Sequence, residues 1–179
     1  MKNIQPAVKG NSSIAEYYPP PAHQWLIDNG HKVTVSEVTG WWKDTGKPEA
    51  LLEGNSLVLH SIETKIEGEV HSDAVIQGRV RIGKGTRIGN HVVIRGPVVI
   101  GENCKLDNCY IGPYTSIGNN VNFARAEFEH SIVMNNVKIN TDKRIVDSIL
   151  GENCTVLSTS HSLPSGHKLV IGENTFVEL

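Results

Sequence analysis

An aliphatic side chain recurs at every sixth position along the middle of the chain. The series is unbroken and comprises Val70, Ile76, Ile82, Ile88, Ile94, Ile100 and Leu106. The residue two positions before each of them is small or β-branched, and a glycine follows several of them. A period of six is neither the helical period nor the alternation of a strand. It predicts short strands joined by corners, with three hexads in each turn of a parallel β-helix and all seven aliphatic side chains buried.

The repeat continues beyond Leu106 after its register shifts by one residue. It resumes at Ile111, Ile117 and Phe123. The pattern is looser from Ala124 to Ser148, which predicts turns with irregular corners, and it returns over Leu169 to Leu179. The polar stretch between them, Ser158 to Lys168, is expected to leave the helix as a loop. We therefore predict one mainly β domain over residues 64–179, with about six turns.

Residues 1–63 do not carry the repeat and are predicted to form a small α/β segment. Three successive prolines, Pro19 to Pro21, remove backbone donors and predict an extended stretch. A short helix is expected over Ala22 to Asp28, with Trp25 and Leu26 buried, ending at an Asn-Gly pair. Apolar and polar residues then alternate over His31 to Val38, which predicts a half-buried strand.

A second helix is predicted over Pro48 to His60, immediately before the repeat. Pro48 suits the first turn of a helix, and Thr45 is a candidate for the N-cap. The residues expected on the buried side are Leu51, Leu52, Val58 and Leu59. A helix that leads directly into a β-helix is expected to be a connector and not a catalytic element.

Composition limits the classes of partner. The 179 residues carry a net charge of -2 and only 6% are aromatic, so the core is expected to be aliphatic. No basic stripe suggests nucleic acid, and no apolar window is long enough for a membrane span. The first residues lack the apolar stretch of a secretion signal, so a cytoplasmic protein is expected. The odd count of cysteines, Cys104, Cys109 and Cys154, predicts buried structural thiols rather than disulfides.

Three features together resemble one enzyme family. They are the stretch WWKDTGKPEALLEGNSLVL at Trp41 to Leu59, the hexapeptide repeats that follow it, and LPSGHKLVIGEN at Leu163 to Asn174. Over about residues 30 to 179 the sequence resembles the C-terminal half of long-form glucose-1-phosphate thymidylyltransferases. The resemblance implies that the β-helix is left-handed. It also implies a preceding nucleotide-binding domain, which in the family makes dTDP-glucose and pyrophosphate from dTTP and glucose 1-phosphate.

The resemblance implies a metal-binding role for Asp44. In the family this aspartate of the W-x-D-T-G motif is one of two that hold the catalytic Mg²⁺. No segment of this sequence matches the second aspartate or the glycine-rich G-G-x-G-T-R-L loop. The chain alone is therefore expected to bind no cofactor and to be inactive. Judged from the residues alone, Asp44 is more typical of a turn or helix cap.

Three classes of function remain open. The first is a structural domain of a nucleotidyltransferase, which packs against a catalytic domain and forms a homo-oligomer; this class requires no catalytic residue. The second is an acetyl-CoA-dependent hexapeptide-repeat acyltransferase with a sugar acceptor, for which His161 is the candidate general base. The third is a scaffold that binds another protein.

Overall fold

The structure is a computed structural model that describes residues 7–8, 15–16, 19–158 and 175–177. The chain divides into two compact units, Met1–Trp42 and Lys43–Leu179. No helix within these described residues is long and apolar enough to cross a membrane.

The first unit contains a small antiparallel strand pair and one helix. Strand β1 (Ala7–Val8) pairs with β2 (Ala15–Glu16), and α1 covers Pro19–Asp28. The expectation that the prolines form an extended stretch is wrong. They occupy the first turn of α1, where backbone N–H groups have no partner inside the helix and proline is tolerated. The predicted end of the helix is confirmed, because Gly30 adopts a φ of 72° and the next N–H bonds back to the helix.

Two further expectations for this unit are wrong. Residues 31–38 form no strand, and Val35 and Val38 are 95% and 66% exposed. Trp25, expected to be buried, is 37% exposed. Alternation predicts a strand only where a neighbouring strand supplies hydrogen-bond partners, and the described residues of this unit place none beside the segment.

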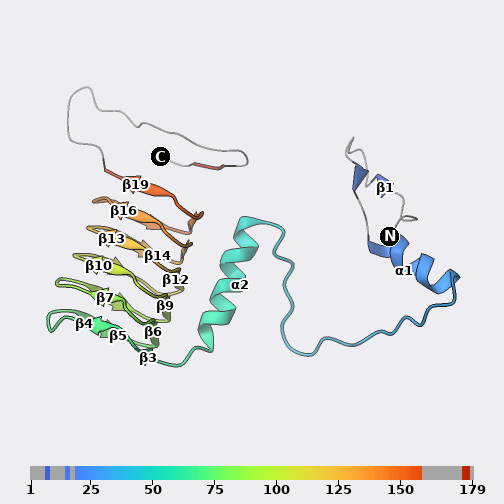
Figure 1. Cartoon of the computed structure of the whole chain (residues 1–179), viewed down its shortest axis with the longest axis horizontal. Helices are drawn as coiled ribbons and strands as arrows, with labels where there is room; N and C mark the ends of the chain where they lie inside the picture. The colour runs from blue at the N-terminus through green and yellow to red at the C-terminus, as the bar shows by residue number, and fades with distance from the viewer. Residues whose placement is uncertain (1–6, 9–14, 17–18, 159–174, 178–179) are drawn as a thin grey trace, which may run out of the picture. The chain divides into compact units, whose positions relative to one another are not determined.

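The second unit is a solenoid of short parallel strands stacked in three sheets (Figure 1). The first face consists of β3 (Lys65–Ile66), β6 (Val80–Ile82), β9 (Val98–Ile100), β12 (Thr115–Ile117), β15 (Ile132–Val133) and β18 (Ile149–Leu150). The second face consists of β4 (Glu69–Val70), β7 (Arg87–Ile88), β10 (Lys105–Asp107), β13 (Asn122–Ala124), β16 (Lys138–Asn140) and β19 (Thr155–Leu157). The third face consists of β5 (Val75–Gln77), β8 (Val93–Arg95), β11 (Tyr110–Ile111), β14 (Glu127–Glu129) and β17 (Arg144–Val146). The predicted fold class, a parallel β-helix after a small α/β segment, is confirmed.

The register of the strands explains the slip in the sequence repeat. Lys105 pairs with Arg87, which lies eighteen residues earlier, but with Asn122, which lies only seventeen residues later. The next step on this face, from Asn122 to Lys138, is sixteen residues. Later turns therefore lose residues at their corners while the strands stay aligned.

The interior is mainly aliphatic, as the repeat predicts, although Phe123 and Phe128 are also fully buried. The first turn is an exception. Ile82, Ile88, Ile94, Ile100 and Leu106 are at most 2% exposed. Val70 is 40% exposed and Ile76 only partly buried, so the prediction that all seven side chains are buried is wrong for the first turn. Both lie on terminal strands of their sheets, β4 and β5, and are covered from one side only.

Burial of the cysteines and of the last described residues also differs between the middle and the end of the solenoid. Cys104 and Cys109 are buried as expected, whereas Cys154, near the far end of the solenoid, is exposed and contradicts the expectation. Of the predicted final run, only residues 175–177 are described. They form no strand there, and Phe176 is 88% exposed.

Helix α2 (Pro48–His60) has the predicted bounds and lies along the first face of the solenoid (Figure 1). It buries Leu52 and Leu59, while Leu51 and Val58, also expected to be buried, are 39% and 55% exposed. The N-cap is Lys47 and not Thr45, and it makes no side-chain capping bond. The helix belongs to the same compact unit as the solenoid. The domain division predicted after residue 63 stays a prediction.

The outward side chains of the first face explain why α2 packs there. Val99, Ser116 and Ile132 lie beside one another on successive strands and are only partly exposed. The outward positions of the second face are instead charged or polar, as at Lys105 and Lys138. Covering the first face with the apolar side of α2 removes apolar surface from water and stabilises the protein, whereas covering the charged second face would not.

Candidate functional site

One corner of the solenoid stacks Tyr114, His130 and Asp147 on successive turns. All three have a positive φ, between 47° and 59°, which lets the chain turn sharply between the third and first faces. The corner repeats once a turn, so the side chains of neighbouring turns lie close together. The His130 ring consequently meets the Asp147 carboxylate, with Nδ1 and Oδ1 2.5 Å apart.

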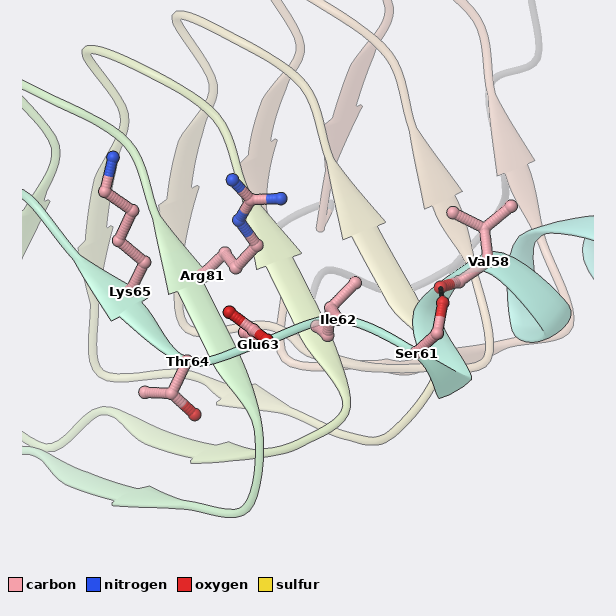
Figure 2. Close-up of a pocket in the computed structure, with 7 residues that line it drawn as sticks. All are labelled: Val58, Ser61, Ile62, Glu63, Thr64, Lys65 and Arg81. Atoms are coloured by element: carbon pink, nitrogen blue, oxygen red, sulfur yellow. Dashed lines mark hydrogen bonds between the residues drawn. The ribbon is translucent and has the colours of Figure 1, made fainter.

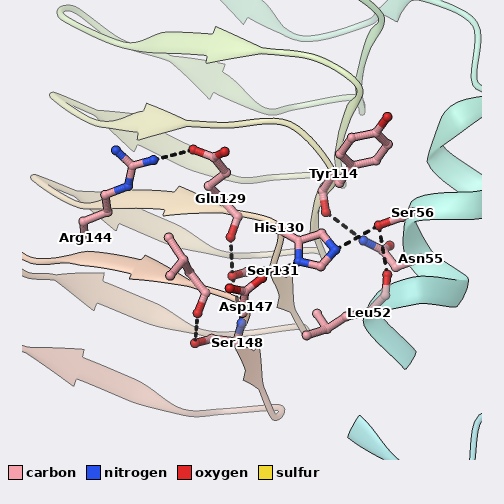
Figure 3. Close-up of polar contacts among 11 residues, drawn as sticks. Leu52, Asn55, Ser56, Tyr114, Glu129, His130, Ser131, Arg144, Asp147 and Ser148 are labelled. Atoms are coloured by element: carbon pink, nitrogen blue, oxygen red, sulfur yellow. Dashed lines mark hydrogen bonds and ion pairs between the residues drawn. The ribbon is translucent and has the colours of Figure 1, made fainter. Parts of the chain in front are cut away.

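Helix α2 supplies the third member of this cluster. The Oγ atom of Ser56 lies 3.1 Å from Nε2 of His130 and 3.0 Å from the carbonyl oxygen of Leu52 (Figure 3). The hydroxyl of Ser56 donates its single hydrogen to the carbonyl oxygen of Leu52, so this hydrogen is not available to Nε2 of His130. The order carboxylate, imidazole, hydroxyl is that of the serine hydrolase triad.

The surroundings of Ser56 do not suit nucleophilic catalysis. A serine nucleophile needs nearby N–H donors for the oxyanion that forms in the transition state. Ser56 lies inside α2, where backbone N–H groups are used by the helix itself. We therefore interpret these contacts as hydrogen bonds that hold α2 against the solenoid.

A second pair of bonds fastens the helix one residue earlier. The side-chain amide of Asn55 donates to the carbonyl oxygen of Tyr114 at 2.9 Å, and the hydroxyl of Ser116 donates to Oδ1 of Asn55 at 2.5 Å. We call the five residues of these contacts the α2 clasp; they are Asn55, Ser56, Tyr114, Ser116 and His130.

Two hollows flank α2. The first has a volume of about 410 Å³ and is lined by Glu53, Ser56, Leu57, His60, Tyr114 and His130. The second, of about 520 Å³, lies where α2 ends and is lined by Val58, Ser61, Ile62, Glu63, Thr64, Lys65 and Arg81 (Figure 2). Both cations of the second hollow act on Glu67, whose pKa is lowered by a hydrogen bond from Lys65 and by nearby positive charge. The second hollow is therefore lined by both acidic and basic side chains, which together do not indicate one class of ligand.

The two residues singled out from the sequence do not join the clasp. Asp44 is exposed and its Oδ1 accepts the backbone N–H of Gly46 at 3.1 Å, as a turn residue does. The neighbouring Lys43 forms an ion pair with Glu53 of α2. Within the described part of the chain, no three His, Cys, Asp or Glu side chains are grouped for a metal ion. The metal-binding role of Asp44 stays a prediction. His161 lies outside the described residues.

The sequence contains a pattern that indicates the clasp but does not belong to the six-residue repeat. Asn55 and Ser56 lie between Leu52 and Leu59, at the spacing of one buried helical stripe. Polar residues inside such a stripe require buried partners. Tyr114, His130 and Asp147 are likewise spaced by one turn of the solenoid.

Several known proteins have sequences similar to this one over much or all of its length. The family model described as the GMPPB C-terminal domain matches residues 94–178. A glucose-1-phosphate thymidylyltransferase from Streptomyces antibioticus is 36% identical over 179 residues, covering 100% of this chain and 48% of the relative. The low-salt glycan biosynthesis nucleotidyltransferase Agl11 of Haloferax volcanii is 38% identical over 180 residues, covering 100% and 49%. The chain therefore spans about half the length of these relatives.

Solved structures with a similar chain trace are more distant. The acetyltransferase domain of PglB from Neisseria gonorrhoeae has a TM-score of 0.34 and 15% identity, over 87% of this chain and 80% of that one. A hexapeptide transferase family protein from Anaplasma phagocytophilum has a TM-score of 0.37 and 24% identity, over 50% and 69%. From the sequence matches, this chain corresponds along its whole length to the C-terminal β-helix region of the sugar-phosphate nucleotidyltransferase family.

Proposed function

We propose that this chain provides the C-terminal β-helix of a sugar-1-phosphate nucleotidyltransferase and that its own role is structural. In this role it holds subunits together as a homo-oligomer and carries the catalytic domain, in the cytoplasmic synthesis of nucleotide sugars. The reaction expected of the whole enzyme is that named for the Streptomyces relative, the transfer of a thymidylyl group to glucose 1-phosphate.

The observation that supports this role is the α2 clasp. Two buried leucines and three side-chain hydrogen bonds hold α2 against the first face of the solenoid. Each such bond contributes on the order of 1 kcal/mol, and burial of a leucine about 2 kcal/mol. A helix held in this way is a rigid connector between the solenoid and the motif at its N-terminal end, where Asp44 lies.

The absence of independent catalysis is tested with the purified chain. It is incubated with dTTP, glucose 1-phosphate and Mg²⁺, and pyrophosphate release is measured against a blank. We expect no turnover. Release above the blank that disappears in the Asp44→Asn variant would overturn the structural role, because the chain would then hold an active site of its own.

Acyl transfer is the second candidate, and calorimetry with coenzyme A distinguishes it. An acyltransferase must bind the cofactor, whereas a structural β-helix gives no heat of binding. Both ring nitrogens of His130 are engaged by Asp147 and Ser56, so this histidine is not free to act as the general base. Coenzyme A binding, together with acetyl transfer to a sugar acceptor that is lost in His161→Ala, would favour the acyltransferase.

A further inference from the structure

We infer that His130 holds α2 to the solenoid in a pH-sensitive way, because its contacts are complete only when both nitrogens of its ring carry a proton. The inference rests on the proposed role of α2 as a rigid connector. It adds to that role the condition under which the connector is held most firmly.

Both ring nitrogens of His130 face hydrogen-bond acceptors. Nδ1 lies 2.5 Å from Oδ1 of Asp147, and an ionised carboxylate can only accept a hydrogen bond. Nε2 lies 3.1 Å from Oγ of Ser56, whose single hydrogen is donated to the carbonyl oxygen of Leu52. The hydroxyl therefore offers a lone pair to Nε2. Only the imidazolium has an N–H group at each position, so it is the form that satisfies both contacts.

The neutral ring makes one hydrogen bond fewer. When its single N–H is on Nδ1, toward the carboxylate, Nε2 and the oxygen of Ser56 present lone pairs to each other. Rotation of the Ser56 hydroxyl toward Nε2 would form a bond there but would give up the bond to Leu52. Since Ser56 belongs to α2 and His130 to the solenoid, the weakened contact is one that joins the two. The bonds of Asn55 are unaffected, so α2 loosens without detaching.

Two ionisable side chains of α2 line the same hollow as His130. Glu53 is one of them, and its charge is balanced by the ion pair with Lys43. The other is His60, which brings a second imidazole to the hollow. A pH effect on α2 must therefore be assigned to His130 by comparison with His60.

The solenoid supplies the remaining groups around the ring. Glu129 precedes His130 in the sequence and pairs with Arg144. The ring of Tyr114 meets the imidazole edge to face, with 6.5 Å between the centres of the two rings. Among the described residues, the only cation that forms an ion pair with Asp147 is His130. The protonated ring thus has a carboxylate partner that no other cation balances, which strengthens the bond from Nδ1.

Loosening of α2 also affects the segment 43–46 that precedes it. Glu53 pairs with Lys43, and a Cβ atom added to Gly54 would lie 3.7 Å from the methyl group of Thr45. The next two residues of α2 hold the solenoid through the clasp. Protonation of His130 is therefore expected to change how firmly the segment that carries the candidate metal ligand is held.

Hydrogen exchange of α2 at two pH values tests the inference, with rates corrected for the pH dependence of intrinsic exchange. Values of about pH 5.5 and about pH 8.5 lie on either side of the range in which imidazoles ordinarily titrate. The side chain of His130 is 36% exposed, so water screens its charge in part, and we expect protection of residues 50–60 to fall about fivefold from the lower pH to the higher.

Three variants assign the effect to this contact. His130→Gln cannot be charged and Ser56→Ala removes the acceptor, so both are expected to be less protected than the wild type at the lower pH and to show no fall. His60→Gln is the matched control from the same hollow and should behave as the wild type does. Circular dichroism of each variant shows that the solenoid is folded.

The outcomes separate the pH dependence from the connector role. Equal protection of wild-type α2 at both pH values would overturn the pH dependence and leave the rigid connector standing. An α2 that is unprotected at both values would overturn both proposals. A fall that His130→Gln retains, or that His60→Gln abolishes, would assign the effect to another group and overturn the inference.

Discussion

The middle turns of the solenoid and the segment 31–42 contain similar apolar residues but differ in what surrounds those residues. Ile94 of β8 is 0% exposed, because strands lie on both sides of it and the opposite faces close the interior. Val35 alternates with polar neighbours as a strand residue does, yet it is 95% exposed. The comparison shows that an apolar pattern states which side of a strand can be buried. Stacked neighbours then decide whether it is buried.

Introducing a charge at Ile94 and at Val35 gives the largest expected difference in the free energy of unfolding between the two regions. Ile94→Asp places an unpaired carboxylate among close-packed side chains and should cost at least about 3 kcal/mol, enough to unfold the solenoid. Val35→Asp should change the free energy of unfolding by less than about 0.5 kcal/mol. Urea unfolding followed by circular dichroism measures both. A stable Ile94→Asp variant would show that the register of the repeat is wrong.

Truncation of two valines compares the middle of the stack with its end. Val98 is 0% exposed and Val70 is 40% exposed, although both belong to the six-residue repeat. Val98→Ala should cost about 2 kcal/mol, since it removes buried methyl groups and leaves a cavity. Val70→Ala should cost less than about 1 kcal/mol. Equal losses in urea unfolding would mean that the first turn is covered by another part of the protein.

Removal of a clasp side chain tests how firmly α2 is held. His130→Ala breaks the bonds to Ser56 and Asp147 and should cost about 1 to 2 kcal/mol. His91→Ala is the matched control, because His91 also has a positive φ, of 52°, but lies at an exposed corner outside the clasp. Hydrogen exchange should quicken in residues 50–60 only in the first variant. Equal exchange in both variants would argue against the clasp.

Substitution of a buried cysteine is expected to change the pH dependence of the free energy of unfolding least at neutral pH and more at alkaline pH. Burial, and secondarily the charge of Asp107, raise the pKa of Cys109 from an ordinary 9.0 to about 12. In the unfolded chain this thiol ionises near pH 9, while in the folded chain it stays protonated until about pH 12. The free energy of unfolding should therefore fall as the pH rises through this window. Cys109→Ala should reduce that fall.

Alkylation gives a second measurement of the same difference. At pH 8 iodoacetamide should modify exposed Cys154 and spare Cys104, whose pKa burial also raises. In urea all three cysteines should react, as counted by mass spectrometry. Rapid modification of Cys104 in the folded protein would contradict the buried middle of the stack.

The sequence by itself determined the inside and outside of each turn. Because the strands repeat every six residues and the turns every sixteen to eighteen, positions such as Ile88 and Leu106 could be assigned to the interior without knowing their neighbours. The bounds of α2 were likewise local, since Pro48 marks its first turn and the repeat begins soon after it.

Tertiary structure decided which surfaces are covered. The sequence places five leucine and valine residues on α2, but the first face accepts the stripe that carries Leu52 and Leu59 and leaves Leu51, Leu57 and Val58 exposed. The clasp depends on Ser56 meeting His130 across 74 positions of the chain, a contact that no local pattern contains. Periodicity reports only the side to which a residue points, whereas a contact of this kind forms only after the whole stack has brought distant residues together.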